Sequence, residues 1–211
     1  MRKSVLAIAA VAALALSACM QQPAPPPAAS TAPVPTRIRG TVDSLNGQTL
    51  IVNKRGGGQA VVALASNYAV LGVVKRPLSS IKPGDYVAST SILGKDGKLH
   101  ATEVHVFPES MRGTGEGQFP WDLYPNSVMT NATVGQVAKS KDGGRILTVT
   151  FKGQSSEVYV GPKVPVVGYA PGNSTLLRRG KAVFIVAQRY PDGSLTANRV
   201  TAEMKGVKPP M

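Results

Sequence analysis

The strongest constraint on the fold of this chain is an internal repeat. Four short motifs recur in the same order at a nearly constant spacing, since Gly40 and Gly135 are 95 residues apart and Asp96 and Asp192 are 96 residues apart. The matched pairs of segments are 39–42 and 134–137, 49–52 and 146–149, 81–87 and 177–183, and 96–101 and 192–197. A repeat of this length is far longer than a solenoid unit, so it predicts two similar domains rather than an array.

Each copy has the sequence pattern of β-strands. Short runs rich in Val, Ile, Leu and Thr are separated by turns such as Asn46-Gly47 and Asp142-Gly143, which is typical of hairpins. Short strands at close spacing favour a small closed barrel, because closure leaves no exposed sheet edge. We therefore predict an all-β chain with two tandem small OB-like β-barrels. A flat sandwich is the alternative.

The last hairpin of each copy has an irregular spacing of apolar residues. In the first copy the next apolar residues after Ala101 are Val104 and Val106, so the alternation of apolar and polar residues slips by one position. The second copy shows the same slip after Ala197. A β-bulge in each strand would return the apolar residues to the core face. The bulges are predicted near Thr102–Glu103 and Asn198–Arg199, which turns Glu103 and His105 outward, with Arg199 and Thr201 at the matching positions.

The N-terminus has the pattern of an export signal. Arg2 and Lys3 precede an uninterrupted apolar run, 5–16. This run is shorter than the roughly 20 residues that cross a hydrocarbon core, and it fits a secretory signal peptide. The following Leu-Ser-Ala-Cys sequence, 16–19, resembles the lipobox of bacterial lipoproteins, in which the Cys is lipidated and becomes the new N-terminus; Cys19 is the only Cys of the chain. The alternative is an ordinary signal peptide that is cleaved after residue 18.

The resemblance to lipoproteins implies a location. Several acyl chains on Cys19 would anchor the protein stably to a lipid bilayer. Met20 follows instead of the Asp that such families use for inner-membrane retention, so the resemblance implies the outer membrane, with the protein facing the periplasm. Residues 21–36 contain six prolines and no charge. They predict a polyproline II tether about 50 Å long, at ~3.1 Å per residue; the alternative is a Pro-rich recognition motif.

The repeated motifs are similar to those of a known family. The pattern Gly-x-Val, Asn-Gly, Leu-x-Val, Pro-Gly-Asp-x-Val and Asp-Gly-x-Leu-x-Ala resembles a widespread family of bacterial envelope domains of unknown function, which are β-barrels, often repeated and often behind a lipoprotein signal. The second copy departs from it, because residues 179–181 read Arg-Gly-Lys where residues 83–85 read Pro-Gly-Asp. The stretch 107–118 also resembles one found in some uncharacterised lipoproteins. The resemblance implies no activity and no functional residues.

Together these patterns predict six segments. They are a lipoprotein signal peptide at 1–18, the lipidated Cys and Pro-rich tether at 19–36, a first β-barrel repeat at 37–107, an ordered connector at 108–132, a second β-barrel repeat at 133–204 and a flexible tail at 205–211.

The charge distribution narrows the possible partners. The chain has 24 basic and 11 acidic residues, and the excess lies in the two repeats, whereas residues 108–132 hold Arg112 against three acids. Basic barrels suit anionic lipid headgroups, an anionic envelope polymer or an acidic protein. Solubility alone is the alternative explanation. We expect no nucleic acid, because the few aromatic residues do not interleave with the basic ones as a base-stacking surface requires.

The residue types offer little for catalysis. A nucleophilic triad needs a His beside a Ser or Cys, but the chain has only two His and no Gly-x-Ser-x-Gly motif. We therefore predict a non-enzymatic binding or structural role at the cell envelope, without a cofactor. A hydrolase of unknown type is one alternative.

A ligand- or metal-binding domain is the other alternative. Glu103 and His105 are two residues apart and so share one face of a strand, a spacing that can chelate. A zinc site needs three or four ligands, and Glu109 and Glu116 in the connector could supply the rest, with Arg112 as a further polar group of a ligand site. A surface Glu–His pair that binds nothing is the simpler interpretation.

The connector has the composition of an ordered segment. It contains Phe119, Trp121 and several other apolar residues, and Trp121 is the only Trp of the chain. Leaving these side chains in water would cost ~25 cal/mol per Å² of apolar surface. Its acidic residues complement the basic repeats. We expect it to pack between the barrels with Trp121 mostly buried, either to fix their orientation or to form part of a ligand site, since ligands often bind between domains.

Overall fold

The computed structural model describes residues 32–210 of the chain. The predicted signal peptide, Cys19 and residues 19–31 of the predicted tether lie outside this range. Residues 32–210 all belong to one compact unit, so the two barrels described below can be placed relative to each other.

The described part of the chain is all-β, which confirms the predicted class. Its strands are β1 (Val34–Asn46), β2 (Thr49–Lys54), β3 (Gln59–Lys75), β4 (Tyr86–Leu93), β5 (Leu99–Val106), β6 (Gly117–Trp121), β7 (Ser127–Lys139), β8 (Arg145–Phe151), β9 (Gln154–Val160), β10 (Val166–Gly172), β11 (Ala182–Arg189) and β12 (Leu195–Glu203). Three one-turn 3-10 helices join them, η1 (Leu78–Ser80), η2 (Glu109–Met111) and η3 (Ser174–Leu176). Within residues 32–210, no helix has the length and apolar character needed to cross a membrane.

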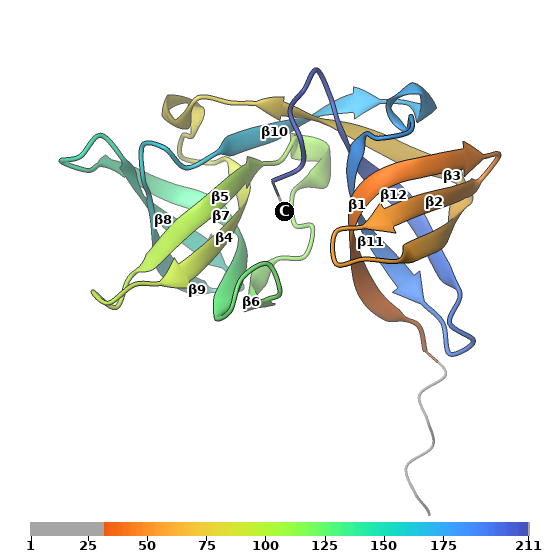
Figure 1. Cartoon of the computed structure of the whole chain (residues 1–211). Coiled ribbons are helices and arrows are strands. Elements are labelled where there is room, and N and C mark those ends of the chain that lie inside the picture. The colour runs from red at the N-terminus through yellow and green to blue at the C-terminus, as the bar shows by residue number, and fades with distance from the viewer. Residues whose placement is uncertain (1–31, 211) are drawn as a thin grey trace, which may run out of the picture. The chain divides into compact units, whose positions relative to one another are not determined.

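The strands close into two barrels of five strands each (Figure 1). Barrel 1 has the order β12-β11-β1-β2-β3, and parallel pairing of β12 with β3 closes it. Barrel 2 has the order β5-β4-β7-β8-β9, and parallel pairing of β5 with β9 closes it. β10 pairs with β3 and β5, and so joins the barrels, while β6 pairs with β7.

The composition of the barrels differs from the predicted one, in which residues 37–107 and 133–204 each form their own barrel. The last hairpin of each segment is exchanged: β4 and β5 complete barrel 2, and β11 and β12 complete barrel 1. The reason lies in β3, whose 17 residues contain no turn signal. At about 3.3 Å per residue this strand extends far beyond barrel 1, so the chain turns back only after it has reached the neighbouring barrel.

The two exchanged halves are held by equivalent contacts. In barrel 2 the Val134 N–H donates to the Asp85 carbonyl, and the Gly84 N–H donates to the Val134 carbonyl, both at 2.8 Å. In barrel 1 Val42 makes the same pair of bonds, with Lys181 at 2.9 Å and Gly180 at 2.8 Å. The structural counterpart of Val42 is therefore Val134. The predicted alignment of 39–42 with 134–137 matched Val42 with Val137, so it was wrong by three residues.

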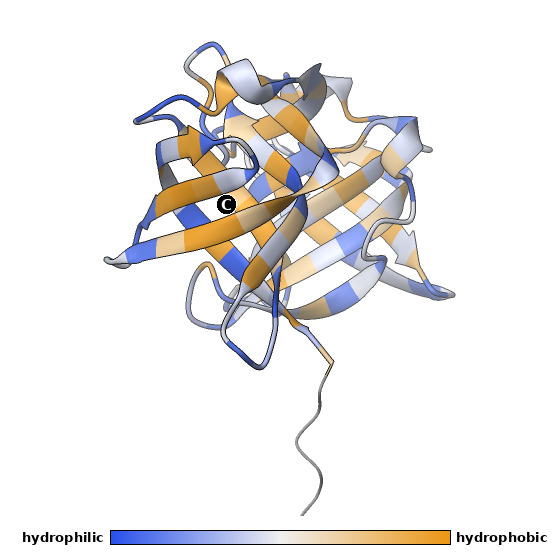
Figure 2. Cartoon of the chain, turned by 90° about the vertical axis from the view of Figure 1, so that its right-hand side faces the viewer, coloured by the Kyte–Doolittle hydropathy of each residue, from blue (hydrophilic) through white to orange (hydrophobic). Residues whose placement is uncertain are grey.

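Three apolar clusters stabilise this arrangement. One fills barrel 1 around Leu50 and Val62, and the second fills barrel 2 around Leu147 and Val158, all four being fully buried. Along β2 and β8 buried residues alternate with more exposed ones, and Figure 2 shows hydrophobic and hydrophilic residues intermixed along the strands. The third cluster lies between the barrels: Ala88, Met129 and Phe184 form it, and Phe107, Phe119 and Trp121 pack against it.

The two predicted β-bulges are confirmed. The pairing of β4 with β5 passes from Glu103 to Ala101 and leaves out Thr102. In the pairing of β11 with β12, four residues of β12, 197–200, lie opposite three of β11, 185–187, so β12 has one extra residue there. As a result Ala101 and Val104 both face the core of barrel 2, and the residues after each bulge change face.

The C-terminal residues fold back onto the barrels, in contrast to the flexible tail predicted for 205–211. Val207 and Met204 exchange backbone hydrogen bonds of 2.9 and 3.1 Å, and Pro209 is buried. The Met204 side chain packs on Gly72 of β3 so closely that a Cβ at this glycine would lie 2.1 Å from the methionine methyl carbon. Residues 204–210 therefore form part of the folded unit.

Candidate functional site

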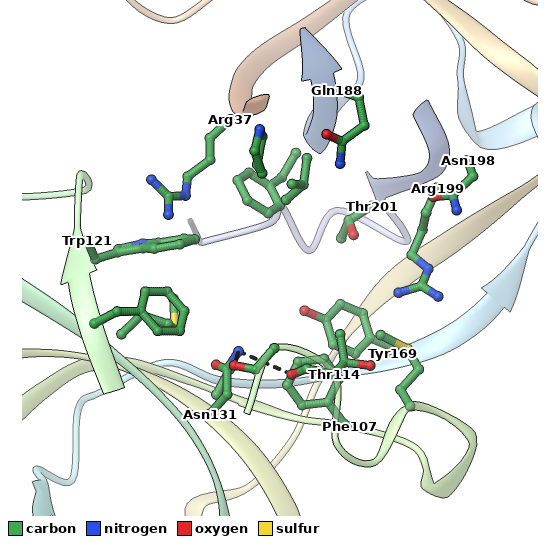
Figure 3. A pocket seen from close by; sticks show the side chains of 18 residues that line it. Arg37, Phe107, Thr114, Trp121, Asn131, Tyr169, Gln188, Asn198, Arg199 and Thr201 are labelled. Atoms are coloured by element: carbon green, nitrogen blue, oxygen red, sulfur yellow. Dashed lines mark hydrogen bonds between the residues drawn. The ribbon is translucent and has the colours of Figure 1, made fainter. Parts of the chain in front are cut away.

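A cleft of about 510 Å³ lies between the barrels. We refer to it as the interbarrel cleft, and it is formed by β1, β11 and β12 of barrel 1, β4 and β7 of barrel 2, β10, and the connector (Figure 3). Its volume is within the range of small-molecule sites, about 300–1,000 Å³. The exchange of hairpins creates the cleft, because it fixes the outer faces of both barrels against one another.

Most of the cleft surface is aromatic or otherwise apolar. Its aromatic residues are Phe107, Phe119, Trp121, Tyr169 and Phe184, and its methionines are Met111 and Met129. Ring contacts join these side chains across the barrels: the Trp121 and Phe184 rings are 6.5 Å apart, and those of Phe107 and Tyr169 are 5.3 Å apart. Such a surface favours an apolar ligand body.

Trp121 is held in place by two arginines of β1. The guanidinium of Arg37 lies 3.9 Å from the ring centroid, and that of Arg39 lies at 5.6 Å. Arg39 also donates two hydrogen bonds, of 2.8 and 3.1 Å, to the Asp122 carboxylate. The pKa of Asp122 is lowered, mainly by the hydrogen bonds from Arg39. Burial is the next-largest effect and opposes the shift, and the charges of Arg39 and Arg37 lower the pKa further. The connector thereby contacts both barrels, although Trp121 is half-buried rather than mostly buried.

Two buried polar atoms of the cleft residues have no hydrogen-bond partner within the described range. They are the indole N–H of Trp121 and the side-chain oxygen of Asn131. The Asn131 amide nitrogen donates to the carbonyl oxygens of Thr114 and Gly115, at 3.3 and 3.0 Å, which leaves its oxygen without a donor. Buried polar groups are usually paired, so these two atoms are exceptions among the described residues.

Arg199 and Thr201 contribute the opposite wall of the cleft (Figure 3). Both lie on β12, at the bulge in residues 197–200 or just after it. Arg199 is exposed, and it makes no hydrogen bond or ion pair within residues 32–210. Its guanidinium is therefore an unpaired charge at the border of the cleft.

Glu103 and His105 face outward from barrel 2 as predicted, but they do not lie on the protein surface. Both are buried, with 1% and 0% of their surface exposed. β10 covers them: the Tyr169 hydroxyl and His105 Nδ1 are hydrogen-bonded at 2.9 Å. Thr90 donates to the Glu103 carboxylate at 2.7 Å, and His105 Nε2 lies 3.8 Å from the same oxygen. The pattern of β5 alone could not show that a later strand covers it.

Tyr169 separates this buried pair from the cleft. Its pKa is raised, mainly by burial and then by the Glu103 charge, while Arg199 has a smaller, lowering effect. The phenol thus stays protonated and neutral. It presents a neutral polar group to the cleft and keeps the Glu103 carboxylate behind the cleft wall.

The other predicted site residues do not line the cleft. Arg112 donates to Glu109 at 2.7 Å and to the Gly84 carbonyl at 2.8 Å, so this pair ties the connector to the turn before β4. The hydrogen bond from Arg112 is the main cause of a lowered pKa of Glu109. Glu116 accepts a hydrogen bond of 2.8 Å from the Lys152 backbone.

The five residues therefore do not form a common site. The buried pair of Glu103 and His105 is separated from the Glu109–Arg112 pair and from Glu116, each of which has a structural partner. Among residues 32–210 no group of three or more His, Cys, Asp or Glu is placed to hold a metal ion. A Glu–His pair by itself does not complete a zinc site, which needs three or four ligands.

Sequence reasoning missed several residues of the cleft. Arg37, Asn131, Tyr169 and Phe184 belong to four different strands, and only the exchanged pairing brings them together. Phe119 and Trp121 carried a detectable signal, since they make the connector unusually rich in aromatic residues.

Comparisons with known proteins do not assign this chain to a family. No protein-family model, no curated protein and no solved structure matches it.

Proposed function

We propose that this protein is a non-enzymatic binding protein of the bacterial envelope, which holds a small, largely apolar molecule in the interbarrel cleft. The observation that carries the proposal is the cleft itself: about 510 Å³ of space, walled by five aromatic rings from both barrels and the connector. A wedge that only fixed the orientation of the barrels would be expected to fill this space. Instead the cleft leaves the Trp121 N–H and the Asn131 oxygen unpaired.

The proposed location follows from the N-terminal sequence. The export signal and the lipobox-like sequence before Cys19 support a lipoprotein anchored in the outer membrane and facing the periplasm. The Pro-rich tether would hold the cleft away from the bilayer. Small apolar molecules and lipid components are the ligands that such a location offers.

We also propose that the chain is a duplication of one OB-like unit. The spacing of 96 or 97 residues in three of the four motif pairs supports this. The equivalent hydrogen bonds of Val42 and Val134, which are 92 residues apart, support it as well. The second copy has lost the Pro-Gly-Asp motif, but Gly180 still makes the bond that Gly84 makes in the first copy.

The alternatives have less support. Glu103 and His105 lie in contact, with His105 Nε2 3.8 Å from the Glu103 carboxylate, and the two residues lie behind Tyr169 rather than in the cleft wall. That position favours a structural role of the pair over hydrolysis or metal binding. The basic residues of the chain would also suit a polyanionic partner. A second cavity combines an aromatic and a basic residue, Tyr159 and Lys98, but carboxylates line it as well, whereas none of the described residues that line the interbarrel cleft carries a carboxylate.

A fluorescent probe tests the proposal directly. N-phenyl-1-naphthylamine is neutral and apolar, and it is fluorescent only when it leaves water. We expect it to bind saturably and to accept energy from Trp121, which is the only Trp of the chain. Phe184→Ala should weaken binding at least fivefold, whereas Tyr190→Ala, which removes an exposed ring outside the cleft, should leave binding unchanged. Absence of saturable binding, or binding without energy transfer from Trp121, would contradict the proposal.

A further inference from the structure

We propose that Arg199 binds an anionic group of the ligand, so that the cleft selects a small amphiphile with an apolar body and one carboxylate or similar oxyanion. This inference rests on the proposed binding function of the interbarrel cleft and adds the chemical class of its ligand.

The first argument is the sign of the charges in the cleft wall. Its ionisable residues are Arg37, Arg199 and Tyr169, and within the described residues no carboxylate is among them. Asp122, which lies 3.6 Å from Arg37 and 2.8 Å from Arg39, offsets one of the two β1 charges. The cleft therefore has a net positive potential, which low-dielectric aromatic walls strengthen.

The second argument is the difference between the two arginines. Arg37 is stacked on Trp121 and has Asp122 as its ion-pair partner. Arg199 has no such partner within residues 32–210, although Glu103 occupies the matching position of the other repeat. Glu103 accepts its hydrogen bond from Thr90, and Tyr169 lies between it and the cleft, so the Arg199 charge remains available to a ligand.

The third argument is the arrangement of polar and apolar groups. In Figure 3, Arg199 reaches over the cleft towards Tyr169 from one side, with Thr201 beside it, and Trp121 lies on the opposite side. A carboxylate at Arg199 could form a bidentate, charge-assisted hydrogen bond. The rest of such a ligand would then lie along the aromatic wall towards Trp121. This layout fits a molecule with one charged end.

Two sources could supply this chemistry: a fatty acid released from lipid, or a small aromatic acid. Both place a carboxylate beside an apolar body. Each acid can be compared with its methyl ester, which has nearly the same shape but no charge.

The experiment is a competition assay in which bound N-phenyl-1-naphthylamine is displaced from the full-length protein. The competitors are dodecanoate and its methyl ester, and 1-naphthoate and its methyl ester. We expect at least one acid to displace the probe at a tenfold lower concentration than its ester, and the pair that shows this preference identifies the source. Arg199→Gln should abolish the preference, and Arg199→Lys should retain most of it.

Arg189→Gln is the matched control, since Arg189 is an exposed arginine of the neighbouring β11 and lies outside the cleft wall. It should retain both probe binding and the preference for acids. Equal displacement by acid and ester in the wild-type protein, or a preference that survives in Arg199→Gln, would overturn the inference while leaving the proposed function intact. Failure of the probe to bind at all would instead remove the proposed function.

Discussion

Residues at matching positions of the two similar sequence segments have different surroundings. Glu103 and Arg199 lie at the two bulges, yet the first is buried behind Tyr169 and the second borders the cleft. The same holds for His105 and Thr201. The difference has a physical cause. β10 covers the outer face of β5 with a tyrosine, which hydrogen-bonds to the buried pair, whereas β3 has a valine, Val73, at the position that pairs with this tyrosine.

The glycines at 40 and 135 provide a test at this scale. A Cβ at Gly40 would lie 2.0 Å from the backbone oxygen of Asn53, whereas a Cβ at Gly135 would lie 3.4 Å from that of Thr148. Gly40→Ala should therefore lower the free energy of unfolding by about 2 kcal/mol, because strand β1 must move away from β2. Gly135→Ala should change it by less than about 0.5 kcal/mol. Urea unfolding of both variants measures the difference, and equal effects would contradict it.

At the scale of elements, β6 connects the two barrels although it pairs with only one of them. Its backbone pairs with β7 of barrel 2. Its last residue, Trp121, and the following Asp122 contact Arg37 and Arg39 of barrel 1 through ring and charge interactions. Part of the contact between the barrels therefore depends on the ionisation of one carboxylate.

The pH dependence of stability should reveal this contact. The pKa of Asp122 is lower in the folded protein than the usual value near 4 in an unfolded chain. Its contribution to stability is thus fully present above pH ~4 and is lost as the pH falls through the lowered pKa. We expect Asp122→Asn to be less stable than wild type by under about 1 kcal/mol at pH 7, since the pair is half exposed, and the difference to shrink as the pH falls from 4 towards 2. Urea unfolding at both pH values measures this.

Glu157→Gln is the control for this comparison, because it neutralises an exposed carboxylate of barrel 2 that has no ion-pair partner within the described range. It should show no comparable pH-dependent difference. A loss of stability in Asp122→Asn that persisted undiminished at pH 2 would mean that the carboxylate charge is not responsible.

At the scale of the whole molecule, neither repeat has a complete barrel of its own. Barrel 1 needs β11 and β12, and barrel 2 needs β4 and β5. The antiparallel pairing of β3 with β10 adds a further link between the halves. The core of each barrel is therefore built from residues that are distant in the sequence, and the barrels should unfold together.

A cut in the connector tests this dependence. A protease site inserted between Pro125 and Asn126, which are exposed, would separate β1–β6 from β7–β12 without breaking any strand. We expect the two fragments to remain together in size-exclusion chromatography and to separate only in denaturant, where they should unfold in a single transition. If each half formed its own barrel, only a short pair of strands would join the two fragments. Separation of folded fragments in buffer would therefore contradict the exchange of hairpins between the barrels.

Part of the candidate site was predictable. The bulges near Thr102 and Asn198 follow from the spacing of apolar residues, and the importance of Trp121 follows from the cost of exposing it. The cleft itself was not predictable, because Tyr169 and Phe184 have no feature in their own strands that indicates which surface they face. Glu103 and His105 have a chelating spacing, but spacing within a strand does not show whether another strand lies over it.

The sequence by itself determined the all-β class, the turns and the bulges, because these depend on local backbone preferences and on the alternation of apolar residues. Only the tertiary structure decided which hairpin closes which barrel. Backbone hydrogen bonds between strands are the same whichever strand supplies them, so β4–β5 and β11–β12 offer equivalent edges to either barrel. The choice depends on the length of β3 and on its pairing with β10, and that choice creates the cleft.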